Sequence, residues 1–266
     1  MEKVKSFMLI LLAVIVSIYL LIGLSLYLFQ DYFLFFPQKL NSNSYSVIKY
    51  KDYAIEINVD DIILHGWLIS SGCNKLIIYY GGNGDEVSTM IPDMQTLDGY
   101  SVLLMNYRGY GLNQGRPSEK ALFRDALAIY DSITKQLNIS GDNVILMGRS
   151  LGSGVAVYVA ANREVSKLVL VTPFDSIRNL AKHYFPIFPM SLILKHPFNS
   201  IDYTRNITTP SLIIMGSKDR TIPNKYSLNL AKHWQGECRK VLIEGADHND
   251  IVTFPEYWQS VKKYLN

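Results

Sequence analysis

The sequence predicts an α/β fold, in which a mainly parallel sheet of eight strands carries helices on both faces and is preceded by one apolar helix. Short runs of almost wholly apolar residues recur along the chain, and such runs are typical of parallel strands buried on both faces. Amphipathic segments with helical spacing alternate with these runs. Hydrophobic residues make up 48% of the 266 residues and charged residues 18%, which suits one large packed domain rather than a disordered chain.

The elements follow in order after the N-terminal helix. A hairpin is expected over residues 53–70, with Asp60 and Asp61 at its turn. Further strands are expected at residues 75–80, 100–107, 143–147, 167–172, 211–215 and 240–244. Helices are expected at residues 117–137, 153–162, 224–234 and 254–265. The first of these helices opens with Pro117 and Ser118, residue types that favour a helix start. This alternation predicts a doubly wound sheet.

An uncharged apolar run occupies residues 7–29. As a helix it would be about 35 Å long, enough to cross the roughly 30 Å apolar layer of a bilayer. A cleaved signal peptide is the alternative, but its apolar core would span about 7–15 residues and precede an A-x-A-like site, which this run lacks. We therefore expect an uncleaved transmembrane anchor at residues 1–30, a juxtamembrane linker at residues 31–46 and the α/β domain at residues 47–266.

The charges around the apolar run predict its orientation. Lys3 and Lys5 precede the run, whereas Asp31 and a single nearby lysine, Lys39, follow it. Positive charge is retained on the cytoplasmic side of a membrane. We therefore expect a single-pass protein with a cytoplasmic N-terminus. Its α/β domain would lie outside the cytoplasm, in the periplasm of a bacterium or in the lumen or exterior of a eukaryotic cell.

The most informative motif is G-R-S-L-G at residues 148–152. It follows an expected strand and opens an expected helix, which is the context in which G-x-S-x-G indicates a nucleophilic serine. The turn would be too tight for side chains on both sides of Ser150, which explains Gly148 and Gly152. The helix N-terminus behind Ser150 would favour developing negative charge. A glycine-rich turn without chemistry is the alternative for this motif taken alone.

Two further residues would complete a catalytic triad with Ser150. Asp219 and His248 each follow an expected strand, and the loops beyond the carboxyl ends of parallel strands meet at one edge of the sheet. His248 would accept the proton of Ser150, and Asp219 would hold the imidazole ring and its charged form. The rival acids are Asp175, which is the runner-up, Asp247 and Asp250. Surface or packing roles are expected for the other histidines, His65, His183, His196 and His233.

An oxyanion hole would need two backbone N–H groups. Leu151, the residue after the serine, would supply one of them. We assign the other to Asn83, in the glycine-rich loop at residues 81–84 after an expected strand. Glycines in this loop would let the backbone approach a substrate oxygen, and a merely flexible turn is the alternative.

Charge and cysteine content exclude several functional classes. A formal net charge of +3, scattered along the chain, argues against a nucleic-acid partner. Cys73 and Cys238 are the only cysteines, so neither a disulfide framework nor a CxxC zinc site can form. We expect no metal and no cofactor. The sequence does not specify an oligomeric state.

From about residue 50 onward the chain resembles the α/β-hydrolases, and among them the membrane-anchored, short-capped serine hydrolases grouped beside the serine aminopeptidases. The shared stretches are NYRGYG (106–111), GRPSE (115–119), GRSLGSG (148–154), TPFDS (172–176), GSKDRTIP (216–223) and GADHND (245–250). The resemblance implies an α/β-hydrolase fold, a triad of Ser150, Asp219 and His248, and a short cap at residues 178–207. Gly81 departs from the usual histidine of this family, which should loosen its loop. Asn113 replaces a common serine and is assigned no role.

Together these features predict a membrane-anchored serine hydrolase. It would cleave an ester, thioester or amide through an acyl-enzyme, on a small-molecule or acyl substrate, with some preference for lipid-derived or acylated compounds. An aminopeptidase-like peptidase is the alternative enzyme, and a catalytically silent binding or scaffolding module is the alternative from another class. Because no triad residue lies in residues 1–31, we also expect a chain lacking them to hydrolyse small soluble esters.

Overall fold

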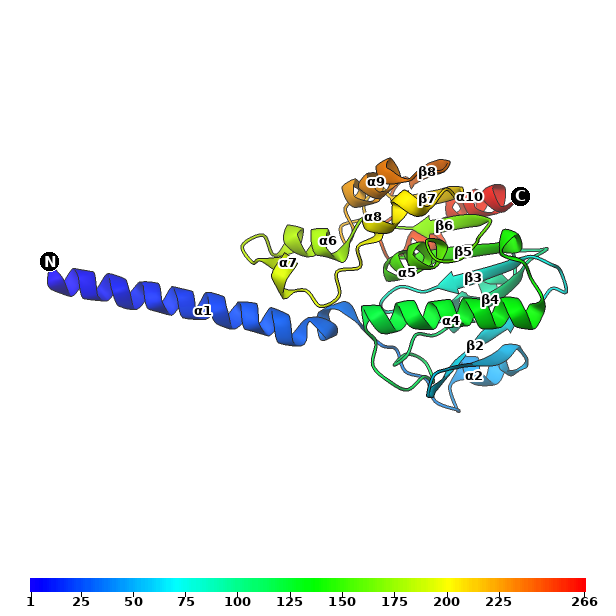
Figure 1. The fold of residues 1–266 in the computed structure, drawn as a ribbon, viewed down its shortest axis with the longest axis horizontal. Helices are drawn as coiled ribbons and strands as arrows, with labels where there is room; N and C mark the ends of the chain where they lie inside the picture. Colours follow the sequence, from blue (N-terminus) through cyan, green and yellow to red (C-terminus); the bar gives the residue numbers. More distant parts are fainter.

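The eight expected strands form one sheet in the computed structural model, which describes residues 1–266 (Figure 1). Their order across the sheet is β1-β2-β4-β3-β5-β6-β7-β8. The strands are β1 (Ala54–Val59), β2 (Ile62–Ile69), β3 (Leu76–Tyr80), β4 (Ser101–Met105), β5 (Val144–Arg149), β6 (Lys167–Val171), β7 (Ser211–Gly216) and β8 (Cys238–Ile243).

The pairing of the strands confirms a mainly parallel sheet. β1 and β2 form the expected antiparallel hairpin, in which Val59 pairs with Ile62. Asp60 at the turn has a φ of 51°, in the left-handed region that Asp tolerates better than most residues. β2 is antiparallel to β4, and every later pair of neighbours is parallel. The parallel strands therefore end at a common edge.

Helices cover both faces of the sheet, as predicted. One face carries α4 (Glu119–Leu137), α5 (Leu151–Ala160) and α9 (Asn224–His233), and the other carries α3 (Ile91–Met94) and α10 (Pro255–Leu265). The expected start of α4 is also confirmed, because the Ser118 hydroxyl accepts a hydrogen bond from the N–H of Ala121.

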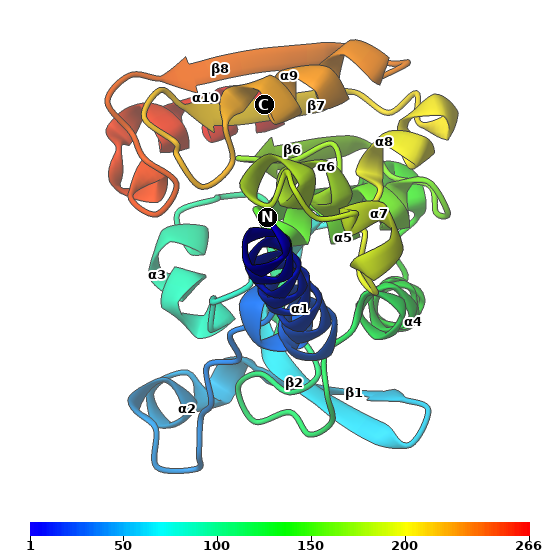
Figure 2. The ribbon, with the colours of Figure 1, turned by 90° about the vertical axis from the view of Figure 1, so that its left-hand side faces the viewer.

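A long N-terminal helix, α1 (Glu2–Leu34), projects from the edge at which the parallel strands end (Figures 1 and 2). It is long and apolar enough to cross a membrane, and its apolar window is wholly exposed on the protein. Between β6 and β7 lies the segment that corresponds to the expected cap, with α6 (Ile177–Tyr184), α7 (Met190–Ile193) and α8 (Ser200–Tyr203). In both views α6 and α7 lie beside α1.

The residues expected to form a juxtamembrane linker are packed against the domain. α1 continues to Leu34, four residues past the expected boundary at residue 30. Phe35 is only 4% exposed and belongs to the main hydrophobic core, because burial of its ring removes a large apolar surface from water. Lys39 forms a β-bridge with Gly111, and the short helix α2 (Tyr45–Lys49) follows. The end of α1 is therefore fixed to the α/β domain.

Candidate active site

Ser150 occupies a strained turn between β5 and α5. Its φ of 50° and ψ of −118° lie outside the regions that L-residues favour, and such strain persists only where the surroundings hold it. A Cβ on Gly148 would collide with the Gly152 carbonyl, and one on Gly152 would collide with the Tyr80 carbonyl. The two glycines are therefore required by the close approach of β3, β5 and α5, as the sequence predicts.

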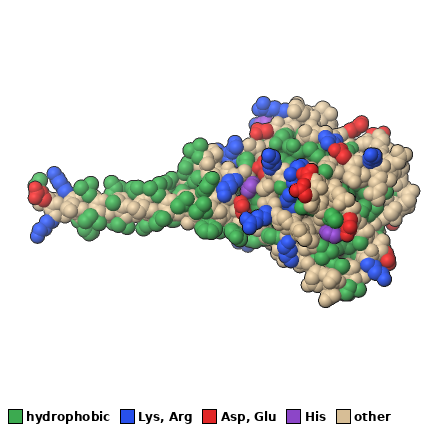
Figure 3. Space-filling model, turned by 60° about the horizontal axis from the view of Figure 1, so that its bottom comes forward, with side chains coloured by type: hydrophobic (Ala, Val, Ile, Leu, Met, Phe, Trp, Pro, Cys, Tyr) green, Lys and Arg blue, Asp and Glu red, His purple; other side chains and the backbone are tan.

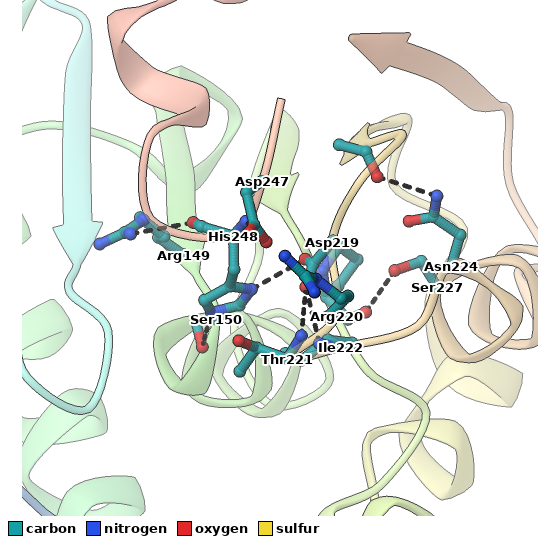
Figure 4. A network of polar contacts seen from close by, with 12 residues as sticks. Arg149, Ser150, Asp219, Arg220, Thr221, Ile222, Asn224, Ser227, Asp247 and His248 are labelled. Atoms are coloured by element: carbon teal, nitrogen blue, oxygen red, sulfur yellow. Dashed lines mark hydrogen bonds and ion pairs between the residues drawn. The ribbon is translucent and has the colours of Figure 1, made fainter. Parts of the chain in front are cut away.

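The side chains of Ser150, His248 and Asp219 form one hydrogen-bonded line (Figure 4). His248 Nε2 lies 3.0 Å from Ser150 Oγ, and His248 Nδ1 lies 2.8 Å from Asp219 Oδ2. The imidazole is 7% exposed and the carboxylate 1%. A buried carboxylate beside Nδ1 favours the imidazole tautomer whose free lone pair on Nε2 faces the serine hydroxyl.

The loop after β7 fixes the orientation of Asp219. Its Oδ1 accepts hydrogen bonds from the N–H groups of Thr221 at 2.9 Å and Ile222 at 2.7 Å (Figure 4). These two donors leave Oδ2 as the oxygen that faces His248. Because both donors stabilise the ionised carboxylate, the second oxygen is held as an acceptor for the histidine N–H.

The rival acids do not contact the ring of His248. Asp175 accepts hydrogen bonds from the side-chain amides of Asn179 and Asn229 and from the N–H of Ser176. Asp247 accepts from the backbone N–H of His248, and Asp250 accepts from the N–H of Asp247. Asp175 thus links α6 to α9, whereas Asp247 and Asp250 shape the loop that carries His248.

Arg149, to which the sequence interpretation gave no role, contacts the loop that carries His248. Its guanidinium pairs with Asp85 at 2.8 Å and donates to the backbone carbonyl of His248 at 3.1 Å. Burial opposes the charge of Arg149, but the charge and hydrogen bond of Asp85, together with Tyr79 and Tyr257, outweigh that effect and raise the pKa of the guanidinium. The charge of Arg149 inside G-R-S-L-G was visible in the sequence, but its partners lie 64 and 99 residues away.

The two backbone N–H groups assigned to an oxyanion hole are both without an acceptor in the protein. Leu151 is the first residue of α5, where helix geometry leaves the N–H unpaired, and the N–H of Asn83 makes no hydrogen bond. The carbonyl of Asn83 accepts from the N–H of Phe36 at 3.0 Å and from the Tyr110 hydroxyl at 2.7 Å. Both amides are therefore available to a ligand.

The end of α1 holds the Asn83 loop directly. The Asn83 side-chain amide donates to the Leu34 carbonyl at 3.1 Å. The Asn83 carbonyl accepts from the N–H of Phe36, so both the side chain and the backbone of Asn83 are bound to the segment at the end of α1. Leu34 and Phe36 both follow residue 31, so the expectation that a chain lacking residues 1–31 hydrolyses small soluble esters stays a prediction. Such a chain would lose most of the helix that precedes the support of the Asn83 amide.

Hydrogen bonds support the loop of Gly81, the glycine that stands in place of the usual histidine. The Gly81 carbonyl accepts from the Tyr107 hydroxyl at 2.9 Å, and the N–H of Gly82 donates to Asp85 at 2.7 Å. Asn113 also has a structural role, because its amide donates to the Asn106 carbonyl and accepts from the N–H of His65. These contacts supply the rigidity that the sequence interpretation expected to be missing.

The other histidines lie outside the triad. His65 pairs with Glu56, His233 contacts the Asn229 carbonyl and His183 lies near Lys225. His196 pairs with Asp31 at the end of α1, and burial lowers its pKa. No group of three or more His, Cys, Asp or Glu side chains could hold a metal ion.

Comparisons with known proteins match most of the chain. A family model described as "alpha/beta hydrolase fold" matches residues 62–192. An uncharacterized protein of Mycobacterium tuberculosis is 33% identical over 205 residues, which cover 75% of this chain and 73% of the relative. Alpha/beta hydrolase domain-containing protein 17C of Xenopus tropicalis is 28% identical over 200 residues, which cover 74% of this chain but less than two thirds (63%) of that protein.

Solved structures share the fold of this chain. An esterase of Pyrococcus furiosus superposes with a TM-score of 0.68 at 22% identity and covers 87% of this chain and 97% of its own. A soluble variant of monoglyceride lipase from Saccharomyces cerevisiae, bound to a substrate analog, superposes with a TM-score of 0.60 at 18% identity, covering 80% and 93%. At these identities the similarity establishes the architecture, and the chemistry has to be argued from the site itself.

Proposed function

Because the chain belongs to the α/β-hydrolase family, we propose that it is a membrane-anchored serine hydrolase with Ser150, His248 and Asp219 as its triad. The observation that carries this proposal is the hydrogen-bonded line from Ser150 Oγ through His248 to Asp219, built on a strained turn of the nucleophile-elbow kind. A scaffolding protein would have no need to maintain either the strain or the buried histidine–carboxylate pair.

The proposed reaction runs through an acyl-enzyme. His248 Nε2 removes the proton of Ser150 while Oγ attacks the substrate carbonyl, and the N–H groups of Leu151 and Asn83 bind the resulting oxyanion. The C–O, C–S or C–N bond to the leaving group breaks, and the leaving group takes the proton from His248. Water then attacks the acyl-enzyme with His248 as the base, releasing the carboxylic acid and restoring Ser150. Asp219 stabilises the imidazolium in both steps.

Activity-based labelling tests the reaction class. We expect a fluorophosphonate probe to label the full-length protein on Ser150, and p-nitrophenyl esters of increasing acyl length to be hydrolysed. Aminoacyl p-nitroanilides in the same assay separate an esterase from the alternative peptidase. A protein that neither reacts with the probe nor turns over any ester or anilide would be the silent module rather than an enzyme.

Replacing Asn83 with alanine tests the contact between α1 and the oxyanion loop. The backbone N–H remains, but its position is no longer held by the Leu34 carbonyl. Loss of an oxyanion donor costs about 10²–10³-fold in kcat, so loosening one should cost roughly tenfold with little change in KM.

Asn162→Ala is the matched control for that variant. The Asn162 amide also donates to a backbone carbonyl, that of Tyr158, but on an exposed turn away from the triad. This variant should keep the wild-type kcat on p-nitrophenyl acetate. A change in KM alone for Asn83→Ala would show that the residue contacts substrate rather than positioning the oxyanion amide.

We propose that α1 remains on the mature protein, with its N-terminus in the cytoplasm. The most apolar 18-residue window of α1, in which no residue is buried, supports insertion, and Lys3 and Lys5 support this orientation. Protease added to intact spheroplasts, or to the corresponding face of sealed vesicles, should therefore digest the α/β domain. Protection of the domain would reverse the orientation. Recovery of a mature chain that lacks about the first 25 residues would identify a cleaved signal peptide.

A further inference from the structure

α1 and the cap touch far from the α/β domain. The Tyr19 hydroxyl donates to the Ile187 carbonyl at 2.9 Å, and the Tyr19 ring stacks on Phe188 with centroids 4.8 Å apart. Gly23, one turn further along α1, presents no side chain to Phe188. Tyr19 precedes Leu34 by 15 residues, which corresponds to about 22 Å of helix. The tip of the cap therefore reaches the middle of the apolar run at residues 7–29.

A second set of contacts joins the cap to α1 nearer the domain. Gln30 is only 6% exposed, although it lies on the transmembrane helix. Its amide donates to the Ile193 carbonyl at 3.1 Å and accepts from the N–H of Lys195 at 2.6 Å. The next residue, Asp31, pairs with His196 at 3.0 Å. A polar side chain buried with all these partners fixes the position of the cap along α1.

An apolar groove with a volume of about 190 Å³ lies around the second set of contacts. Ten of its eleven lining residues are hydrophobic, and Gln30, the exception, is occupied by the cap backbone. Its walls include Leu26, Phe33 and Leu34 of α1, facing Ile177, Ala181 and Tyr184 of α6. From Leu26 to Leu34 the helical wall runs for about 12 Å, which suits an extended aliphatic chain.

The two walls of the groove contact the loops on either side of the triad. Leu34 accepts the hydrogen bond from the Asn83 amide. Tyr184 donates to the carbonyls of Arg220 and Thr221, the residues that follow Asp219, at 2.6 and 3.1 Å. The groove therefore lies next to the two loops between which an acyl carbonyl would reach Ser150, and no triad residue lines it.

The opposite end of the groove, at Leu26, lies within the apolar run of α1. In Figure 3, the side chains along α1 beyond its charged N-terminus are mostly hydrophobic, and charged side chains gather where this stalk meets the domain. Near the cap tip, Ile187 is 71% exposed and Leu192 is 85% exposed. Because the cap contacts α1 within its apolar run, these side chains lie at or inside the boundary of the bilayer when that run crosses it.

We propose that this groove binds the aliphatic acyl chain of a membrane-resident substrate, which enters sideways from the bilayer. This inference rests on the proposed serine hydrolase activity and names its substrate class: an ester or thioester of a medium or long acyl chain. α1 is then both the anchor and one wall of the acyl site. The chain lies between α1 and α6, and its carbonyl reaches Ser150 between the Asn83 and Asp219 loops.

Filling the groove tests the proposal in the full-length protein held in lipid nanodiscs. The Ala181→Trp variant places an indole between α6 and α1. The indole would leave no room for a long acyl chain in the groove. The ratio of kcat/KM for p-nitrophenyl decanoate to kcat/KM for p-nitrophenyl acetate should therefore fall about tenfold or more, because each methylene bound in an apolar pocket contributes strongly to selectivity. Labelling by a small fluorophosphonate shows that the triad is assembled in the variant.

A second variant and a control keep the test decisive. Phe33 is 62% exposed, so Phe33→Ala removes part of the wall without disturbing the core, and the same ratio should fall about threefold. Ala128→Trp, at a half-buried position on α4, should leave the ratio at its wild-type value.

The outcomes distinguish failure of the proposed acyl site from failure of the proposed hydrolase activity. Turnover of both esters with an unchanged ratio in Ala181→Trp and Phe33→Ala would overturn the acyl site and leave the serine hydrolase standing. Wild-type protein that is not labelled by the fluorophosphonate and cleaves neither esters nor anilides would overturn the proposed function and the acyl site together.

Discussion

Replacing Ser150 with alanine is expected to lower turnover of p-nitrophenyl esters by about 10⁶-fold, the loss typical of a triad nucleophile. The physical reason is the geometry of the strained turn, which holds Oγ 3.0 Å from His248 Nε2. No other hydroxyl contacts this nitrogen, so no neighbour can form the acyl-enzyme in its place. Initial rates on p-nitrophenyl acetate and labelling by fluorophosphonate measure the effect.

Ser166→Ala is the control for that loss. The Ser166 hydroxyl donates to the Val144 carbonyl at the amino end of β5, on the opposite edge of the sheet from Ser150. This variant should be labelled and should turn over at the wild-type rate. If Ser150→Ala kept substantial turnover, or if the label appeared on another residue, the assignment of the nucleophile would be wrong.

The sheet was predictable because its signals are local. Each parallel strand is a short apolar run, and such runs are typical of strands buried on both faces of a parallel sheet. The turn at Ser150 was predictable for a related reason. The atoms that collide with a Cβ on Gly148 or Gly152 belong to the same strand–turn–helix unit and to its neighbouring strand β3. Once the strands are assigned, the loops that carry Asp219 and His248 follow at their ends.

The supports of the site were not predictable, because they join segments that share no local pattern. Arg149 meets Asp85 from a distant loop, and Asn83 meets Leu34 at the end of an apolar helix. The position at which α1 ends, four residues past the expected boundary at residue 30, was not predictable for the same reason. Hydropathy falls near Gln30, but the helix continues because Phe35 is buried in the core and Gln30 is bound by the cap. α6, α7 and α8 are short, and their positions depend on tertiary contacts rather than on periodicity.

The other large effect is expected from Asp219→Asn, which should lower kcat on the order of 10⁴-fold. Oδ1 of Asp219 already accepts from the N–H groups of Thr221 and Ile222. An asparagine would keep its carbonyl oxygen there and turn its NH₂ group toward His248. Nδ1 would then have to accept a hydrogen bond, so the ring proton would move to Nε2. A protonated Nε2 cannot take the proton of Ser150.

The same substitution at the rival acids separates this tautomer effect from a general loss of charge. Asp175→Asn changes a carboxylate that binds the side chains of Asn179 and Asn229, so it should reduce thermal stability more than turnover. Asp247→Asn should have a smaller effect than Asp219→Asn, because Asp247 accepts from the backbone N–H of His248 and does not contact the imidazole ring. Values of kcat on p-nitrophenyl acetate, normalised to the folded fraction, rank the three variants. A larger loss of kcat for Asp175→Asn would assign the role of triad acid to Asp175, in the loop after β6. Equal losses of kcat in all three variants would show that the negative charge, rather than the imidazole tautomer, determines turnover.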